Sequence, residues 1–433
     1  MQPASLRLKC YPFAPVQRPA FFALLIACTA SLSAQSDRGK NSTDPVFGEI
    51  QFDQWLNHSD QTHIRWNVQI SDPLLSSHQR IAARVFAQVD GNELAKRRGK
   101  GTLLVLVQID DERGHVWQNH QEMDLETLEE GIKANDAVFS QQFFVLPGDY
   151  RIVTALYDTA TSEHSLNKHR LHVSPLKNDP LPDAWRDLPP VEFIHPSKPP
   201  DSWYLPAIET ALHLSAAPRE PVRINLIVNL TPSERLAGSS RVQNRNFGSL
   251  LPATKLLSEV DWGTSPFHLE LLDLARLKVT YRQEHAGPLD WLITNASLQE
   301  VKPGLIDVKS LENRQHSAQF FLDQVNKQLQ TKQPQTVLII LSSAVEFGAG
   351  QEMRPVVPDP AGNARVFYVR YLTPAGRMGG RRGNGFPPNN PNQSPFDQLA
   401  GLLKPLEPHL YEVSSPEQFR KALAAILAEV SKL

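Results

Sequence analysis

The first part of the chain alternates between apolar and polar residues. The clearest runs are HIRWNVQI at 63–70, RIAARVFAQV at 80–89 and TLLVLVQI at 102–109. In an extended strand, a period of two places the apolar side chains on a single face. Residues that favour turns separate the runs, such as Asp90-Gly91 and the charged stretch at 110–114. About seven short strands of this kind predict a β-sandwich over residues 45–174.

A tyrosine follows the tightest of these turns. Pro147-Gly148-Asp149 forms the turn, and Tyr150 opens the next strand. A tyrosine at such a corner is typical of the Greek-key corner of immunoglobulin-like sandwiches. We therefore predict an all-β, immunoglobulin-like sandwich as the N-terminal domain.

The hydrophobic pattern changes in the second part of the chain. Residues 335–343, QTVLIILSS, are a continuous apolar run, as expected of a strand that is covered on both faces. Two further strands are expected in VRINLIVNL at 222–230 and ARVFYVRYL at 364–372. The stretch FHLELLDLARLKVTYRQE at 267–284 predicts a hairpin, because the apolar parity shifts near Asp273.

Two stretches in this second part have the period of a helix. In HSAQFFLDQVNKQLQ, one face would consist of Ala318, Phe321, Leu322, Val325 and Leu329. The C-terminal stretch begins with Ser415 as N-cap, Pro416 at N1 and Gln418 to complete a capping box. Its buried stripe would be Phe419, Leu423, Ile426, Val430 and Leu433. Strands that alternate with helices predict a doubly wound, Rossmann-type α/β domain over residues 207–433.

Two segments carry neither pattern. Residues 175–206 are rich in proline, which removes backbone donors and favours extended structure, so they predict a semi-rigid linker. Trp185, Val191 and Phe193 indicate that part of this linker packs against a domain. Residues 375–396 are dominated by Gly, Pro, Asn and Arg and predict a flexible insert, because no core can be built from them.

The N-terminus has the layout of a secretory signal peptide. Arg7, Lys9 and Arg18 precede the apolar run FFALLIACTASLS at 21–33. This run is too short to span a membrane, and we expect cleavage after Ala34 and no transmembrane span elsewhere. A looser lipoprotein motif with Cys28 as the lipidated residue is an alternative. We therefore predict an exported protein, periplasmic or extracellular.

Charge and cysteine content argue against several classes of function. The formal net charge is -2 at pH 7, which provides no general attraction to nucleic acid or to an anionic membrane. Cys10 and Cys28 are the chain's two cysteines, and both lie in the segment expected to be removed. The mature protein would then have neither disulfides nor thiol chemistry and would depend on packed cores.

The sequence lacks the common catalytic motifs. It contains no G-x-S-x-G, H-E-x-x-H, Walker P-loop or G-x-G-x-x-G. Asp110, Asp111 and Glu112 are adjacent acids, but a charged hairpin turn explains them better than an acid–base pair. His169 and His172 would point to opposite faces of a strand, which disfavours a shared metal.

Basic residues gather at two places. Lys96, Arg97, Arg98 and Lys100 lie near an expected hairpin tip, and Arg377, Arg381 and Arg382 lie in the flexible insert. Together they could contact phosphates or acidic glycans. No aromatic residue lies in sequence beside the first group to form a stacking platform, so we favour a solvated surface.

The order of elements in the second part resembles that of a von Willebrand factor A domain. The elements that carry the resemblance are VRINLIVNLTPS, the hairpin at 267–281, QTVLIILSS, ARVFYVRYL, the strand in HLYEVSS and the terminal helix. More narrowly, the whole chain resembles exported bacterial proteins with a von Willebrand factor A-related domain. The PGDYRIVTALYD strand and the proline-rich link fit such proteins as well.

The resemblance implies a metal-ion-dependent adhesion site that has lost its carboxylates. In the family, an Asp in D-x-S-x-S and a later Asp supply charge to a divalent cation. Here Asn229, Thr231 and Ser233 stand at the first motif, and Ser342 or Ser343 stands at the later Asp. Without charge, the dehydration of Mg²⁺ is poorly offset, so we expect no metal and no other cofactor.

We expect these five positions to be binding residues of a metal-independent recognition surface. The surface would consist of residues 229–233, 238–241 and 342–344, at the carboxyl ends of the strands. The expected function is non-enzymatic binding of another envelope or extracellular protein. The alternative is an exported hydrolase or glycan-processing enzyme with an unrecognised site, which rests on analogy with other exported sandwich proteins.

Overall fold

The computed structural model describes residues 43–57, 64–129, 135–194, 210–231, 240–290, 293–294, 296, 313, 316–329, 335–345, 347, 364–372 and 397–433, with the backbone alone for 240–246. The chain divides into two compact units, 1–38 and 39–433, and all of these residues belong to the second. The expected signal peptide, both cysteines, Ser233 and the insert at 375–396 lie outside the described residues.

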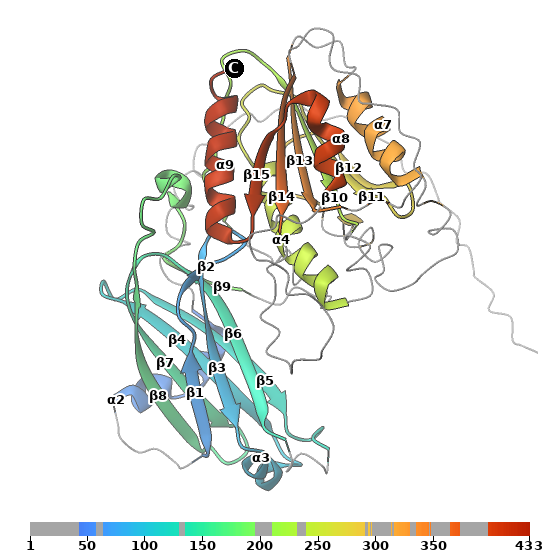
Figure 1. The fold of residues 1–433 in the computed structure, drawn as a ribbon. Helices are drawn as coiled ribbons and strands as arrows, with labels where there is room; N and C mark the ends of the chain where they lie inside the picture. The colour runs from blue at the N-terminus through green and yellow to red at the C-terminus, as the bar shows by residue number, and fades with distance from the viewer. Residues whose placement is uncertain are drawn as a thin grey trace, which may run out of the picture. The chain divides into compact units, whose positions relative to one another are not determined.

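Residues 64–193, here called the β region, form two antiparallel sheets (Figure 1). The five-stranded sheet consists of β1 (Trp66–Ile70), β2 (Leu74–Leu75), β3 (Ile81–Val89), β6 (Ala137–Val145) and β9 (Val191–Phe193). The four-stranded sheet consists of β4 (Thr102–Asp111), β5 (Val116–Asp124), β7 (Gly148–Asp158) and β8 (His164–Val173). Side chains from both sheets share a core, for example Val85 and Phe143 with Val107 and Ile152. The two sheets therefore face each other, as the alternation predicted.

Strand β4 departs from simple alternation because its outer face is also covered. Leu104 and Leu106 point away from the shared core and pack with Phe47 and Phe52. Those aromatic residues belong to two short helices, α1 (Pro45–Glu49) and α2 (Phe52–Asn57). The run TLLVLVQI is thus buried on both faces, and the chain that precedes the first strand provides the cover.

The connection between β3 and β4 is a helix, which corrects the prediction of a hairpin there. Helix α3 spans Gly91–Arg97, and the Asp90 side chain accepts hydrogen bonds from the backbone amides of Asn92 and Glu93. Asp90-Gly91 is therefore an N-cap and the first helical residue, and not the predicted turn. The two strands that α3 joins belong to different sheets.

A tyrosine hydrogen bond fixes the corner between the two sheets. The Tyr150 hydroxyl donates to the Leu146 carbonyl oxygen at 2.9 Å, across the turn between β6 and β7. Burial, together with the carboxylates of Asp111 and Asp149, raises the pKa of Tyr150 to about 12. The hydroxyl therefore remains protonated and keeps this bond over the physiological pH range.

The proline-rich segment contains regular structure. Residues Pro182–Trp185 form a 3-10 helix, and β9 pairs with β6 inside the five-stranded sheet. Val191 and Phe193 belong to the core shared by the two sheets, and Trp185 packs against its border. The expectation that part of this segment packs is correct. The same segment also supplies a strand, which the expected linker of 175–206 did not include.

Residues 222–433, here called the α/β region, contain a six-stranded sheet in the order β12-β11-β10-β13-β14-β15. Its strands are β10 (Arg223–Asn229), β11 (Phe267–Asp273), β12 (Lys278–Gln283), β13 (Thr336–Ser343), β14 (Ala364–Tyr371) and β15 (His409–Val413). All neighbours are parallel except β11 and β12, which form the predicted antiparallel hairpin. Every residue of β13 is buried, as its continuous apolar run requires.

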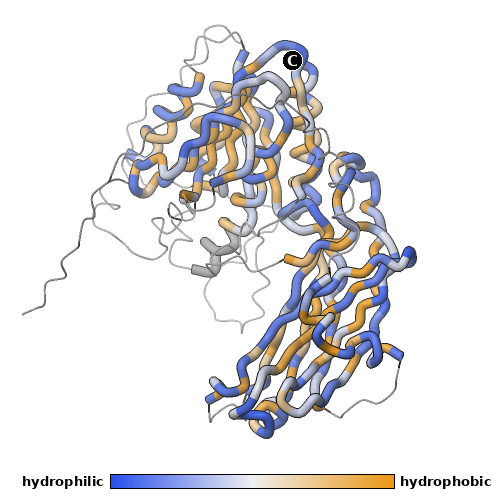
Figure 2. Tube along the Cα trace, turned by 180° about the vertical axis from the view of Figure 1, so that it is seen from behind, coloured by the Kyte–Doolittle hydropathy of each residue, from blue (hydrophilic) through white to orange (hydrophobic). Residues whose placement is uncertain are grey.

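Helices cover both faces of this sheet, and the strands accordingly lie in the middle of the region (Figure 1). On one face, α4 (Ser240–Ser258) and α9 (Pro416–Val430) pack with Leu226, Val228 and Ile339. On the other face, α7 (Ser317–Leu329) and α8 (Gln398–Leu403) pack with Ile227, Leu338 and Ile340. A short 3-10 helix, Lys404–Leu406, follows α8. The hydropathy colouring of Figure 2 shows the same layers, with predominantly apolar central strands.

The two long helices follow their predicted faces. All five residues predicted for the face of α7 are buried. In α9, Phe419, Leu423, Ile426 and Val430 are buried, and Leu433 packs at the edge of the core. Ser415 caps the Gln418 amide at 3.3 Å, but the Gln418 side chain accepts from the Ser414 amide, so the capping box closes one residue early. Within the described residues, no helix combines the length and apolar character needed to cross a membrane.

Candidate functional site: the carboxyl edge of the six-stranded sheet

The strand order places a switch point between β10 and β13. In chain order the sheet runs 3-2-1-4-5-6, so the connections from these two neighbouring strands proceed in opposite directions. In open α/β sheets, ligands bind in the crevice beyond the carboxyl ends of strands at such a point. Asn229 is the last residue of β10, and Ser342 and Ser343 end β13. The structure therefore brings these predicted residues together at the position where the fold places ligands.

Asn229 is the centre of the polar contacts at this point. Its side-chain amide donates to the Ser342 Oγ at 2.9 Å and to the Thr231 carbonyl oxygen at 3.4 Å. Its side-chain carbonyl oxygen accepts from the Thr231 amide at 2.9 Å. The Ser342 hydroxyl in turn donates to the Ser343 carbonyl oxygen at 2.7 Å. The turn is thus an Asx-type turn that is tied to the neighbouring strand by an amide–hydroxyl bond.

The Thr231 hydroxyl connects this turn to β11. It accepts from the Leu274 amide at 2.7 Å and donates to the Asp273 carboxylate at 3.4 Å. Asp273 also accepts from Arg276 Nη1 at 2.7 Å and from two backbone amides of its own turn. Asp273 is not among the predicted site residues. It could have been found because it ends β11, whose carboxyl end meets the same edge of the sheet as that of β10.

Burial changes the role of the predicted residues. Asn229 and Ser342 are 0% exposed and Ser343 is 4% exposed, whereas Thr231 and Ala344 are half-buried. Asn229, Ser342 and Ser343 consequently shape the edge and cannot form a contact surface in this conformation. Ser233 lies outside the described residues, as do 238–239 and the side chains of 240–241.

The groups at this edge do not fit a divalent cation. Asn229 directs an amide donor at Ser342, and its carbonyl oxygen is used by the Thr231 amide. The nearby carboxylate, Asp273, is paired with Arg276. Mg²⁺ and Ca²⁺ need several oxygen ligands with net negative charge. Among the described residues, no group of three His, Cys, Asp or Glu side chains is arranged to hold a metal.

A charged cluster occupies the next part of the same edge. Asp397, whose side chain is 1% exposed, accepts from the Tyr368 hydroxyl at 2.9 Å and from Arg370 Nη1 at 3.2 Å. It also accepts from the Val345 amide at 3.0 Å and caps α8. Arg370 forms a second ion pair with Glu412. Burial and the Asp397 carboxylate raise the pKa of Tyr368 well above its usual value, so its phenol acts as a donor and does not ionise near neutral pH.

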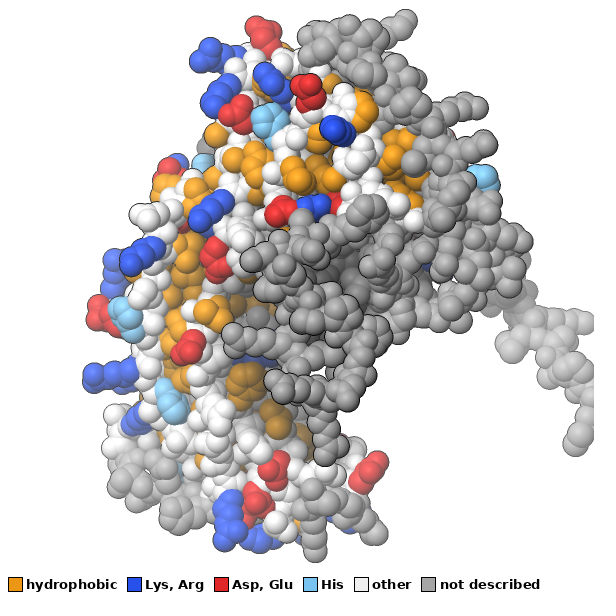
Figure 3. Space-filling view, in the orientation of Figure 1, with side chains coloured by type: hydrophobic (Ala, Val, Ile, Leu, Met, Phe, Trp, Pro, Cys, Tyr) orange, Lys and Arg blue, Asp and Glu red, His pale blue; other side chains and the backbone are white. Residues whose placement is uncertain are grey.

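The weaker candidates take part in structural contacts. Arg97 lies on α3 and pairs with Asp158 at 2.9 Å, and Lys96 pairs with Glu93 at 2.7 Å. Arg151 on β7 pairs with the largely buried Asp110 on β4 at 2.5 Å. This ion pair between neighbouring strands gives Asp110 a structural role. Acidic and basic side chains lie interspersed among the described residues on the face that Figure 3 shows.

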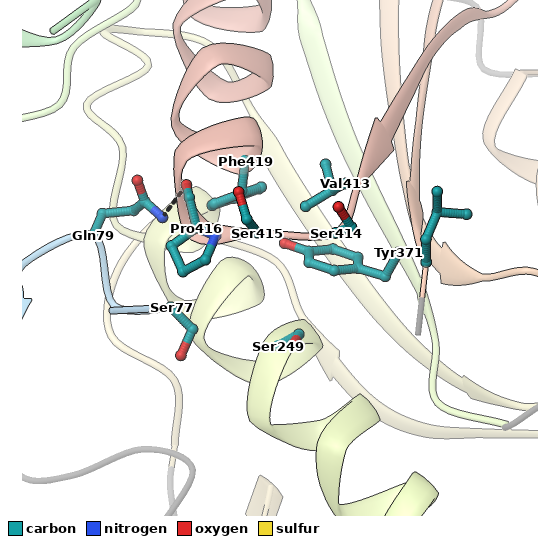
Figure 4. A pocket seen from close by; sticks show the side chains of 10 residues that line it. Ser77, Gln79, Ser249, Tyr371, Val413, Ser414, Ser415, Pro416 and Phe419 are labelled. Carbon is teal, nitrogen blue, oxygen red and sulfur yellow. Dashed lines mark hydrogen bonds between the residues drawn. The ribbon is translucent and has the colours of Figure 1, made fainter. Parts of the chain in front are cut away.

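A pocket lies at the carboxyl ends of β14 and β15, beside the amino end of α9 (Figure 4). Its volume is about 90 Å³, and its lining includes Ser77 and Gln79 from the β region with Ser249, Tyr371 and Ser415 from the α/β region. Among the described residues, none that lines this pocket is charged. Sequence reasoning missed it because Gln79 and Ser415 are distant in the chain and share no motif.

No protein-family model matches the chain, and no curated protein matches it. Among solved structures, the Northeast Structural Genomics Consortium target SoR45 is similar at 11% identity and a TM-score of 0.17, covering 28% of this chain and 96% of its own. The putative ApaA protein from Bordetella pertussis is similar at 10% identity and a TM-score of 0.17, covering 27% of this chain and 100% of its own. Likenesses at this level carry no argument about function.

Proposed function

We propose that this chain is an exported, non-enzymatic protein-binding protein whose α/β region is related to von Willebrand factor A domains. The carboxyl edge of its six-stranded sheet would recognise another envelope or extracellular protein without a metal. The observation that carries the proposal is the neutral, internally bonded turn of Asn229, Thr231 and Ser342 at the switch point.

The architecture supports this proposal at the level of the fold. The order 3-2-1-4-5-6 is the doubly wound order, and the hairpin strand β12 lies antiparallel at one edge. In the β region, the hydroxyl of Tyr150 bonds to the backbone four residues upstream, a geometry that favours an immunoglobulin-like sandwich. Both features are expected of the exported proteins that the sequence resembles.

The chemistry of the edge supports recognition without a metal. Its amide and hydroxyl groups satisfy one another, so the turn keeps its shape without a bound ion. Ala344 follows β13 directly and is half-buried, which makes it the described position best suited to report on a partner. A partner would contact the partly exposed residues that border the edge, such as Ala344, while the buried Asn229 and Ser342 hold these residues in place.

A photo-cross-linking residue at Ala344 tests the proposal in the intact chain. In the cells that produce the protein, we expect a discrete adduct with a second protein, at equal yield with and without a chelator. The matched control is the same residue at Arg170, an exposed position on β8. An adduct that disappears with chelator would contradict metal independence. Equal adducts at both positions, or none at Ala344, would contradict the placement of the surface.

Calorimetric titration of Mg²⁺, Ca²⁺ and Mn²⁺ into the chelator-treated chain tests the metal separately. We expect no saturable heat at millimolar cation. Saturable binding that is lost in Asn229→Ala would show that neutral oxygens suffice, and would make metal-dependent adhesion the better explanation.

A further inference from the structure

Residues 174–190 of the β region leave its two sheets after β8 and return to them at β9. They follow β8 directly and end where β9 re-enters the five-stranded sheet beside β6. Between these strands, Ala184 and Leu188 are buried in the core of the α/β region, with Leu181 and Trp185 packed at its border. This segment, here called the strap, is thus a loop of one region that inserts into the core of the other.

A buried arginine of α9 holds the strap. Arg420 is 2% exposed, and it donates to both carboxylate oxygens of Asp179, at 2.6 and 2.8 Å. The same guanidinium donates to the Leu181 carbonyl oxygen at 2.8 Å and lies 4.8 Å from the centre of the Trp185 ring. A bidentate pair of this kind fixes direction as well as distance. Burial alone would raise the pKa of Asp179, but the bonds from Arg420 and the Leu181 amide outweigh it, so the pKa lies below its usual value.

Gln79, a strained residue of the β region, contacts both Arg420 and the strap. Gln79 has φ +58°, a left-handed conformation that is unfavourable for a residue with a side chain, and it is 0% exposed. Its carbonyl oxygen accepts from Trp185 Nε1 at 2.8 Å and from Arg420 Nη1 at 3.4 Å. Its side-chain amide donates to the Pro416 carbonyl oxygen at 3.1 Å (Figure 4). Strain of this kind persists only where surrounding contacts impose it.

We propose that the strap is a latch that makes the β region and the α/β region move as one body. Arg420 is its positioning residue, because its guanidinium bonds both to the strap, at Asp179 and Leu181, and to Gln79, which lies just before β3. When Arg420 loses these partners, the strap leaves the α/β core and the two regions reorient independently. The pocket at the amino end of α9 would widen as the latch opens, because Gln79 lines it.

Spin-label distances across the two regions test the latch in the full chain. Labels are attached at Arg170→Cys on β8 and Ala428→Cys on α9, both exposed, after Cys10 and Cys28 have been replaced. We expect one narrow distance distribution in the parent chain and a distribution at least twofold broader with Arg420→Met. The matched control is Lys421→Met, which removes a positive charge from an exposed neighbour on the same helix.

A second variant and a second readout separate latch opening from general unfolding. Asp179→Asn weakens the same pair from the strap side and leaves α9 intact. In both variants, amide hydrogen exchange should rise at least tenfold in residues 176–190 and remain unchanged in β13. An unchanged distance distribution in both variants would overturn the proposal. So would exchange that rises equally in the strap and in β13.

Discussion

The carboxyl edge of the six-stranded sheet satisfies its buried polar groups in two different ways. Beside β10, Asn229, Thr231 and Ser342 bond to one another without any charge of their own. Beside β14, Asp397 and Arg370 form a buried ion pair to which Glu412 adds a second carboxylate. A neutral bond contributes about 1 kcal/mol, whereas removing one partner of a buried ion pair costs about 3–5 kcal/mol. The β14 side is therefore more sensitive to the loss of a single partner than the β10 side.

The largest loss of stability is expected when the ion pair beside β14 is broken. Asp397→Ala leaves Arg370, the Tyr368 hydroxyl and the Val345 amide without their shared acceptor. We expect a loss of about 3–5 kcal/mol in the free energy of unfolding, measured with urea. Glu412→Ala removes the other carboxylate of Arg370, which is 44% exposed, and should cost no more than about 1 kcal/mol. Equal losses would show that burial does not determine how much stability is lost when each carboxylate is removed.

A second buried carboxylate extends the comparison to the edge hairpin. Glu270 is 0% exposed; burial opposes its charge, but His268, Lys327 and Arg282 together lower its pKa to about 2. A lowered folded-state pKa stabilises the fold above the usual value of 4.5, and this contribution disappears as pH falls towards 2. At neutral pH the contribution is about 3 kcal/mol.

The pH dependence of Glu270→Gln measures this contribution. The stability difference between the parent chain and the variant should be largest above pH 4.5 and shrink steadily towards pH 2. Urea unfolding across this range provides the measurement. A difference that is constant with pH would mean that the charge of Glu270 does not stabilise the fold.

Asn229→Asp would place a negative charge beside β10, where the side chains of Asn229, Thr231 and Ser342 are neutral. A carboxylate at this buried position faces Ser342 Oγ with Asp273 close by, so we expect a loss of about 1–3 kcal/mol in cation-free buffer. If the edge retains the geometry of a metal site, millimolar Mg²⁺ or Ca²⁺ should restore part of the loss in this variant. The same cations should leave the parent chain unchanged. Thermal unfolding with and without cation measures both, and Asn225→Asp, at the other end of β10, controls for the added charge.

The smallest loss of stability is expected from a substitution in the β region. Tyr150→Phe removes one hydroxyl bond to the Leu146 carbonyl and keeps the ring in the shared core. The expected cost is about 1 kcal/mol, because a single neutral hydrogen bond is lost. Tyr157→Phe, at a half-buried tyrosine farther along the same strand, should cost less. A loss well above that of Asp397→Ala would reverse the ranking of neutral and charged contacts.

Much of the secondary structure was predictable because its cause is local. The continuous run of β13 and the apolar faces of α7 and α9 follow from periodicity, and Ser415 caps its helix as predicted. The helix α3 was missed because Asp-Gly is compatible with both a turn and an N-cap. The strand β9 was missed because its short run is embedded in prolines and pairs with a strand far away in sequence.

Within the candidate site, the sequence alone determined that residues 229 and 231 follow one strand and that residues 342 and 343 end another. It also determined that none of them carries a charge. Only the tertiary structure decided that β10 and β13 are neighbours, that Asn229 bonds to Ser342, and that Asp273 joins them. It likewise decided that Arg420 of α9 holds Asp179, 241 positions away. The physical reason is that periodicity and capping act over a few residues, whereas strand order and buried ion pairs join segments that only packing brings together.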